Sequence, residues 1–233
     1  MNLFYIPNIE TNGVLPDEEA AHAVRVLRLK EGDTLFATDG KGNMYTTKIV
    51  LATNKQCVVA VESKTEGEKV CNANVHIAVA PTKNMDRNEW FAEKATEIGI
   101  NKISYLNCRF SERKVIKTER IEKIVVSAMK QSLKAYKPVV EEMIDFDKFI
   151  AQDFGNVRKF ISHCHNTEKA ELKDVVTKGQ DTLVMIGAEG DFSEEEVAKA
   201  VSMGFEPVSL GRARLRTETA ALVACHTINI INQ

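Results

Sequence analysis

The sequence predicts an α/β protein in two parts, a small β-rich domain over residues 1–70 and a larger domain over residues 73–233. Short apolar runs separated by tight turns fill the first part, and this pattern is typical of a small barrel. After residue 73, strand-like runs alternate with helical patterns, which predicts a mostly parallel sheet. Residues 63–70 are charged and contain Gly67, so we expect a linker between the parts.

In the first part, each expected strand is a short run rich in apolar and β-branched residues. Asp17–Leu29 has a helical pattern, and Asp39-Gly-Lys-Gly42 has the composition of a hairpin turn. The expected strands are Leu3–Ile6, Thr34–Thr38, Met44–Leu51 and Gln56–Glu62.

In the second part, apolar runs of four to six residues predict strands, and apolar residues three or four positions apart predict helices. The expected strands are Val75–Ala80, Lys102–Leu106, Lys159–Ser162, Leu183–Ile186 and Pro207–Leu210. The expected helices are Arg87–Gly99, Thr118–Ala135, Ser193–Met203 and Thr217–Ile231.

Two of these helices carry further signals. Ser193 and Glu196 have the spacing of a capping box, which marks a helix start. Gly99 suits a helix end. The helix before Gly99 is expected to bury one face, which consists of Trp90, Phe91, Ala95 and Ile98.

Composition limits the possible functions. The 233 residues carry a net charge of −2, so nucleic-acid binding would need a local basic patch. The five cysteines are odd in number and scattered, which favours a reducing, cytoplasmic location. No secretion signal or membrane-spanning run is apparent, so we expect no membrane partner. His163-Cys-His165 lacks a second ligand cluster, so we expect no metal.

A glycine-rich turn, Gly187-Ala-Glu-Gly190, follows an expected strand and precedes the capped helix. A backbone without side chains can approach a ligand closely there, beside helix N–H groups. The segment is neither a dinucleotide-binding fingerprint nor a P-loop. An ordinary turn between strand and helix stays the alternative.

A second turn is dense in arginine, with Arg212, Arg214 and Arg216 at alternating positions. In an extended segment these side chains would share one side and repel unless an anion or carboxylates offset them. Glu189 and Glu218 could do part of this, and a solvated surface is the alternative. Two such turns close in sequence suggest one ligand pocket.

A third basic group, His22, Arg25 and Arg28, recurs every three residues beside inward Val24 and Leu27. This spacing gives the small domain a basic face suited to phosphates. A helix face that is exposed to solvent and binds no ligand explains the pattern equally well.

Together these segments resemble the ribosomal RNA small-subunit methyltransferase E family, within the SPOUT class of methyltransferases. The resemblance covers nearly the whole chain, in order. It is carried by His22-Ala-Val-Arg-Val-Leu-Arg28, Lys83 with Glu89-Trp-Phe-Ala-Glu-Lys-Ala-Thr-Glu-Ile-Gly99, Gln131-Ser132, Ile186-Gly-Ala-Glu-Gly-Asp-Phe192, and Leu210-Gly-Arg-Ala-Arg-Leu-Arg-Thr-Glu-Thr-Ala220.

The resemblance implies a PUA-like RNA-binding β-barrel over residues 1–70 and a SPOUT domain with a trefoil knot over 73–233, an exception to the rule that chains do not thread. It implies a homodimer that binds S-adenosylmethionine in the knot. The implied reaction is methylation of N3 of a uridine in the decoding region of 16S ribosomal RNA, so the partner is this RNA or the small ribosomal subunit.

Given this resemblance, we hypothesise roles for individual residues, with the arginines chosen because they lie beside the expected cofactor loop. Arg216 would stabilise the uridine anion, with Arg214 or Arg212 in support, and Glu189 or Glu218 would orient an arginine or accept the proton. The cofactor contacts would be Ile186, Gly187, Glu189, Gly190, Leu210, Gly211, Leu215 and Thr217. The RNA contacts would be His22, Arg25, Arg28, Lys83, Arg87 and Arg113.

The chain departs from the family pattern in three places. Ala188 and Asp191 replace a proline and a glycine, Ala213 replaces an arginine, and Lys130 replaces a glutamate and adds positive charge where RNA is expected. Two alternatives stay open. One is an RNA-binding ribosome-assembly factor with a degenerate cofactor site, and the other is a SPOUT methyltransferase that acts on tRNA.

Overall fold

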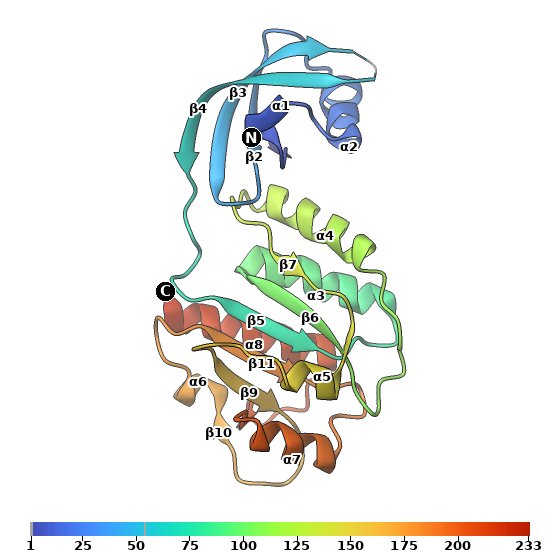
Figure 1. Ribbon diagram of the computed structural model, residues 1–233, viewed down its shortest axis with the longest axis vertical. Helices are drawn as coiled ribbons and strands as arrows, with labels where there is room; N and C mark the ends of the chain where they lie inside the picture. Colours follow the sequence, from blue (N-terminus) through green and yellow to red (C-terminus); the bar gives the residue numbers. More distant parts are fainter. Residues whose placement is uncertain (1, 54) are drawn as a thin grey trace. The chain divides into compact units, whose positions relative to one another are not determined.

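The computed structural model describes residues 2–53 and 55–233. The chain divides into two compact units. The first consists of Met1–Lys69 with Val126–Lys137, and the second of Val70–Val125 with Pro138–Gln233. A segment from the middle of the chain therefore packs with the N-terminal residues (Figure 1). None of the helices in the described part is long and apolar enough to cross a membrane.

The first unit contains a four-stranded sheet in the order β1-β2-β3-β4. β1 pairs with β2 in parallel, and the other pairs are antiparallel. The strands are β1 (Leu3–Tyr5), β2 (Thr34–Thr38), β3 (Asn43–Ala52) and β4 (Cys57–Glu66), and the helices are α1 (Ile9–Asn12), α2 (Asp17–Ala21) and the π-helix η1 (His22–Val26). Their apolar side chains form one buried cluster.

All four strands predicted here are confirmed, with small changes at their ends. β4 continues to Glu66, so half of the linker predicted over residues 63–70 is strand instead. The helical pattern over Asp17–Leu29 is confirmed as α2 followed by η1. The β2–β3 hairpin turns at Gly40 and Gly42, whose positive φ angles of 74° and 105° suit glycine.

The second unit contains a parallel sheet in the order β10-β12-β9-β11-β5-β6-β7, with β8 also paired to β6. The strands are β5 (Val75–Val79), β6 (Lys102–Asn107), β7 (Val139–Val140), β8 (Ile144–Asp145), β9 (Arg158–Ser162), β10 (Ala170–Glu171), β11 (Thr182–Ile186) and β12 (Glu206–Ser209). The helices are α3 (Met85–Ile98), α5 (Phe146–Ile150), α6 (Leu172–Val175), α7 (Glu194–Ser202) and α8 (Thr217–Asn232).

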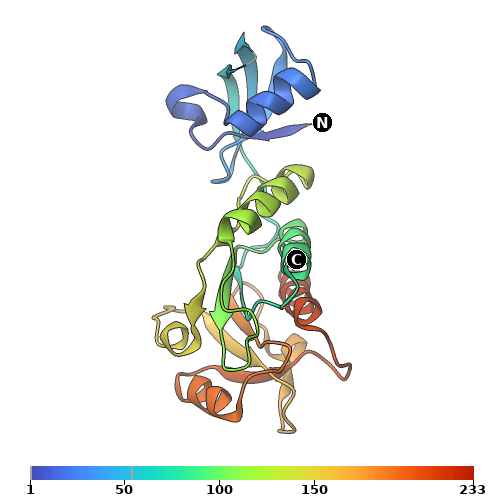
Figure 2. The same ribbon diagram turned by 90° about the vertical axis from the view of Figure 1, so that its right-hand side faces the viewer.

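Helices cover both faces of this sheet (Figure 2). Successive side chains of a strand point to opposite faces, so Val184 joins one buried cluster, with residues of α3 and α8, whereas Leu183 and Met185 join another, with residues of α5 and α7. β5 and β11 are buried throughout their lengths, and apart from His76 and Thr182 their residues are apolar, as expected for strands covered on both faces.

The capping box at Ser193 and Glu196 is confirmed at the start of α7. The prediction that Trp90 faces the core is wrong. Phe91 and Ala95 fill the buried face of α3, and Trp90 at its margin stays 41% exposed.

α4 (Thr118–Gln131) passes from the second unit into the first. It ends four residues before the predicted Ala135, because Leu133 has a positive φ of 56°. Near its end, Lys130 forms an ion pair with Glu19, whose side chain is 8% exposed. The positive charge expected to face RNA is therefore compensated within the first unit.

Replacing Lys130 with Met should destabilise the first unit, because the buried Glu19 carboxylate loses its partner. Removing one member of a buried pair typically costs about 3 kcal/mol. Urea denaturation of the Lys130→Met variant measures the loss. The double variant with Glu19→Gln should recover much of it, and equal stability of wild type and single variant would contradict the pairing.

Candidate active site

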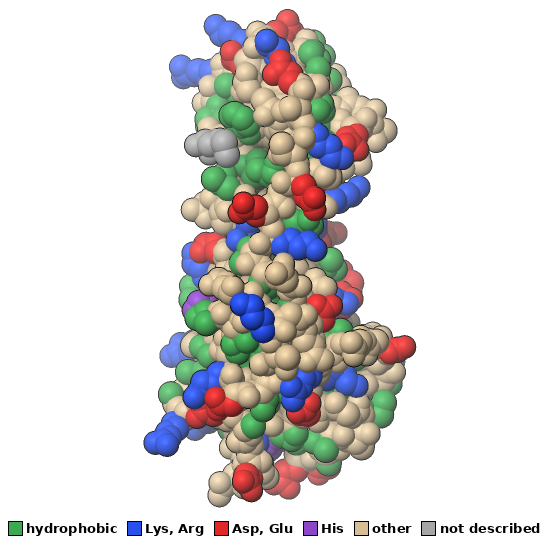
Figure 3. Space-filling view, turned by 90° about the vertical axis from the view of Figure 1, so that its left-hand side faces the viewer, with side chains coloured by type: hydrophobic (Ala, Val, Ile, Leu, Met, Phe, Trp, Pro, Cys, Tyr) green, Lys and Arg blue, Asp and Glu red, His purple; other side chains and the backbone are tan. Residues whose placement is uncertain are grey.

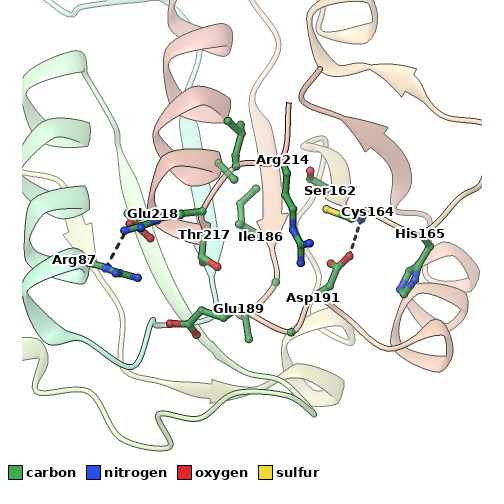
Figure 4. A pocket seen from close by; sticks show the side chains of 16 residues that line it. Arg87, Ser162, Cys164, His165, Ile186, Glu189, Asp191, Arg214, Thr217 and Glu218 are labelled. Carbon is green, nitrogen blue, oxygen red and sulfur yellow. Dashed lines mark hydrogen bonds and ion pairs between the residues drawn. The ribbon is translucent and has the colours of Figure 1, made fainter. Parts of the chain in front are cut away.

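The sheet order places β12, β9 and β11 side by side, so the loops that follow them meet at one edge. Ligands of open parallel sheets bind at this carboxyl edge. A cavity of about 600 Å³ opens there (Figure 4). Its lining consists of Arg87, Ser162, Cys164, His165, Ile186, Gly187, Ala188, Glu189, Gly190, Asp191, Arg214, Leu215, Arg216, Thr217, Glu218 and Ala220.

A second cavity of about 530 Å³ adjoins the first, with which it shares five lining residues: Ser162, Cys164, Arg214, Leu215 and Ala220. All eight predicted cofactor contacts line one or both cavities. Leu210 and Gly211 line the second, Leu215 lines both, and the first takes the other five: Ile186, Gly187, Glu189, Gly190 and Thr217.

The turn after β11 is closely packed. A Cβ atom added at Gly187 would lie 2.9 Å from the backbone of Asp191 and Phe192. One added at Gly190 would lie 3.0 Å from the Cβ of Phe110. A side chain at position 187 would clash with this backbone, and one at position 190 would require Phe110 to shift by a few tenths of an ångström. Both glycines line the first cavity.

Asp191 fixes this turn to the loop after β9. Its φ is 68°, a left-handed conformation that glycine adopts without strain. One carboxylate oxygen accepts a hydrogen bond from the backbone N–H of Cys164 at 2.6 Å, and the other from that of Phe192 at 2.8 Å. Asp191, which replaces the glycine of the family pattern, thus links two walls of the cavity.

The three arginines of the loop after β12 take different positions. Arg214 lines the first and second cavities, and Figure 4 shows it extending into the first near Asp191. Arg216 lines the first cavity and Arg212 the second. The segment bends at Arg212 and Ala213 and forms no strand, so the condition under which these side chains would share one side is not met.

The two candidate carboxylates differ in their surroundings. Glu189 is exposed, and its Oε1 accepts a hydrogen bond from the backbone N–H of Lys83 at 3.0 Å. Glu218 is 8% exposed, and its Oε1 lies 3.7 Å from Nε of Arg87, which reaches from α3 (Figure 4). The Oε2 of Glu218 has no hydrogen-bond partner among the described residues.

Three of the predicted RNA contacts, His22, Arg25 and Arg28, are exposed in the first unit. In the second unit, Lys83 pairs with Glu112 at 2.8 Å. Positive and negative side chains are interspersed over the face that Figure 3 shows.

Arg113 donates hydrogen bonds to the carbonyl oxygens of Thr82 and Lys83 at 3.1 and 2.5 Å. It therefore braces the loop after β5. Its contact with RNA stays a prediction.

The contribution of the loop after β9 was missed in the sequence. His163-Cys-His165 was weighed only as a metal motif, but Cys164 and His165 line the first cavity and His163 the second. His165 Nε2 lies 2.8 Å from the carbonyl oxygen of Phe192. Among the described residues, no three His, Cys, Asp or Glu side chains cluster as metal ligands would.

Burial lowers the pKa of His163 from 6.5 to about 4, and the positive charge of the nearby Lys169 is the second cause. The folded protein thus keeps this ring neutral, whereas the unfolded chain binds a proton below about pH 6.5. The unfolding free energy should therefore fall as the pH drops from 6.5 toward 4. In His163→Leu this fall should be smaller, as urea denaturation at several pH values would reveal. An unchanged pH slope would contradict the assignment.

Asp191→Ala should destabilise the second unit by about 2–3 kcal/mol, because it removes two hydrogen bonds and leaves a strained φ angle. Asp191→Gly loses the same bonds without the strain, so its loss should be smaller. Chemical denaturation of the two variants separates the contributions, and equal losses would show that the φ angle costs nothing.

Comparisons with known proteins support one family. Residues 69–229 match the RNA methyltransferase domain, and residues 15–62 match the RNA methyltransferase PUA domain. The chain is 27% identical over 216 residues to Ribosomal RNA small subunit methyltransferase E of Buchnera aphidicola, spanning 90% of this chain and 84% of that protein. The Bacillus subtilis protein of the same name is 26% identical over 226 residues, spanning 91% and 87%.

Solved structures agree with this result. A probable rRNA methyltransferase of Porphyromonas gingivalis is 44% identical, with a TM-score of 0.94 over 100% of this chain and 98% of that one. Ribosomal RNA small subunit methyltransferase E of Neisseria gonorrhoeae, bound to S-adenosylmethionine, is 25% identical with a TM-score of 0.84, over 97% and 95%. The chain therefore belongs to the ribosomal RNA small-subunit methyltransferase E family.

Proposed function

We propose that this protein transfers a methyl group from S-adenosylmethionine to N3 of a uridine in the decoding region of 16S ribosomal RNA. The observation that carries this proposal is the pair of adjoining cavities at the carboxyl edge of the sheet, which two motif-bearing turns enclose. The relatives named as small-subunit RNA methyltransferases support the RNA substrate, and the resemblance in sequence motifs supplies the uridine position.

The cavities fit the cofactor. S-adenosylmethionine, when bound, supplies a methyl group on a positively charged sulfonium. The backbone of Ile186–Gly190 would hold it on one side and that of Leu210–Thr217 on the other. Gly187 and Gly190 line the first cavity without side chains. Two adjoining spaces suit the bent cofactor that the resemblance implies.

The chemical step needs position and a nucleophile with an available electron pair. Uridine N3 carries a proton, and losing it places negative charge on O2 and O4. A guanidinium near these oxygens would stabilise that charge. Arg216 is proposed for this role because it lines the first cavity, and Arg214 would support it.

The remaining assignments are also proposals. Residues 1–70 would form a PUA-like barrel that binds RNA through His22, Arg25 and Arg28, and residues 73–233 the SPOUT domain with Lys83, Arg87 and Arg113 as further contacts. The three converging loops after β9, β11 and β12 suit a trefoil knot. By resemblance the protein would act as a homodimer in the cytoplasm, where its ribosomal substrate lies.

Arg216→Ala should lower methyl transfer to small ribosomal subunits by about 100-fold or more, as the loss of one charge-stabilising donor typically does. Cofactor affinity by calorimetry should stay nearly unchanged. Arg109→Ala is the matched control, because Arg109 pairs with Glu195 outside the first two cavities. A wild-type rate in Arg216→Ala would refute its catalytic role.

The wild-type protein tests the function itself. Mass spectrometry of nuclease-digested RNA from a deletion strain should locate the missing methyl group in 16S ribosomal RNA. Failure of the wild type to bind S-adenosylmethionine would favour an RNA-binding assembly factor. Loss of a methyl group from tRNA alone would favour a tRNA enzyme.

A further inference from the structure

A third cavity, of about 390 Å³, borders the first. The start of α3 supplies one side of it and the start of α8 the other. It is lined by Asp86, Arg87, Trp90, Arg216, Glu218 and Thr219. Arg87, Arg216 and Glu218 also line the first cavity. A group in the third cavity would therefore lie against the wall that bounds the proposed cofactor site.

Trp90 gives this cavity a flat apolar surface. It is the one tryptophan of the sequence and is 41% exposed. An exposed indole beside arginine side chains is the combination on which nucleobases stack in proteins that bind single-stranded nucleic acid. The lining thus suits a planar, polar-edged ligand.

Glu218 has an unsatisfied acceptor on the shared wall. The residue is 8% exposed, and its Oε2 has no hydrogen-bond partner in the described part of the chain. Leaving a buried carboxylate oxygen without a donor is unfavourable. A ligand that brings an N–H group would remove this cost.

Arg87 is the charged neighbour of the Glu218 carboxylate. Its side chain is 37% exposed, and the ion pair with Glu218 is 3.7 Å long, beyond hydrogen-bond distance. Because this contact is weak, the guanidinium keeps its N–H groups available for a ligand. The lining of the third cavity thus includes donors from Arg87 and Arg216 and an acceptor from Glu218.

We propose that the third cavity is the pocket for the target base, and that it selects uracil. Uracil presents an acceptor, a donor and an acceptor along its O2, N3–H and O4 edge, which complements Arg87, Glu218 and Arg216. Trp90 stacks on the ring. This proposal rests on the proposed methyltransferase function and assigns the proton acceptor within it.

The proton transfer balances. The N3–H bond breaks, an O–H bond forms on Glu218, and N3 keeps the electron pair. That pair would form the N3–CH3 bond as the S–CH3 bond of the sulfonium breaks, and neutral S-adenosylhomocysteine would leave. Arg87 and Arg216 stabilise the charge that spreads to O2 and O4. The proton leaves Glu218 for solvent after the methylated base departs.

The same arrangement rejects cytosine. Its N3 is an acceptor and would face the Glu218 carboxylate, and its amino group would face an arginine. Like groups opposed in a desolvated pocket exclude the wrong ligand more effectively than missing contacts do. Selection between the two pyrimidines therefore depends on Glu218.

Tryptophan fluorescence tests binding, because Trp90 is the sole tryptophan. The full-length protein, with S-adenosylhomocysteine, is titrated with a short oligocytidine RNA that carries one central uridine, and with the all-cytidine RNA. The uridine RNA should quench Trp90 emission and bind at least about fivefold more tightly, the smallest ratio expected for a bidentate contact. Equal quenching and affinity for both RNAs would overturn the proposal.

Glu218→Gln tests the proton acceptor, since an amide has the same shape but is a far weaker base. Methyl transfer should fall at least about 100-fold, the remaining rate should rise steadily with pH, and the preference for uridine in the fluorescence titration should disappear. A variant that keeps the wild-type rate, pH profile and base preference would refute the role of Glu218.

Matched variants separate this role from structural effects. Glu189→Gln should alter cofactor affinity but keep the uridine preference, and Glu171→Gln, outside all three cavities, should change nothing. Trp90→Ala should raise KM for RNA, and Trp90→Phe should raise it less because phenylalanine keeps an aromatic ring on which the base can stack. If Trp90→Ala instead changes only the mass found by sedimentation, Trp90 serves a subunit contact and the stacking role is refuted.

Two different results distinguish the role of Glu218 from the methyltransferase function as a whole. A wild-type protein that neither binds S-adenosylmethionine in calorimetry nor methylates ribosomal RNA refutes the function and, with it, the assignment of Glu218. A wild-type protein that does both, with a Glu218→Gln variant of unchanged rate, pH profile and base preference, refutes the assignment alone.

Discussion

The site depends on the register of three parallel strands, β12, β9 and β11, whose carboxyl ends lie side by side. Ser162, the last residue of β9, lies opposite Ile186 of β11 on one side and Val208 of β12 on the other. The loops that follow therefore start at nearly the same height and bend over one another. A register shift in either pair would separate the walls of the first and second cavities and remove the space that they share.

Asp191 shows how this geometry is maintained. The carboxylate accepts hydrogen bonds from the backbones of Cys164 and Phe192, so the turn after β11 and the loop after β9 form one unit. Glycine at this position would adopt the same φ freely but could not make the link. The chain accepts some backbone strain at Asp191 in exchange for a fixed spacing between two cavity walls.

Sequence periodicity predicted the long elements because local pattern and burial agree there. Periodicity did not predict the elements that form only through contacts between residues far apart in the sequence. β7, β8 and β10 have two residues each and exist only through pairing with β6 or β12. Two site loops carried visible glycine and arginine patterns, whereas the contribution of Cys164 arises from the place of β9 between β11 and β12. Trp90 was misassigned because periodicity does not separate the margin of a buried helix face from its centre.

The charges of the site explain why its acidic residues are not equivalent. Arg87, Arg214 and Arg216 would repel a cationic cofactor if nothing offset them, and Glu189, Asp191 and Glu218 line the same cavity. Asp191 uses both oxygens to hold backbone N–H groups, and Glu189 holds that of Lys83. Protonating Asp191 would weaken a contact that shapes the cavity, and Glu189 is exposed and does not line the third cavity. Glu218 keeps an oxygen without a donor among the described residues, so it can take a proton while the walls stay in place.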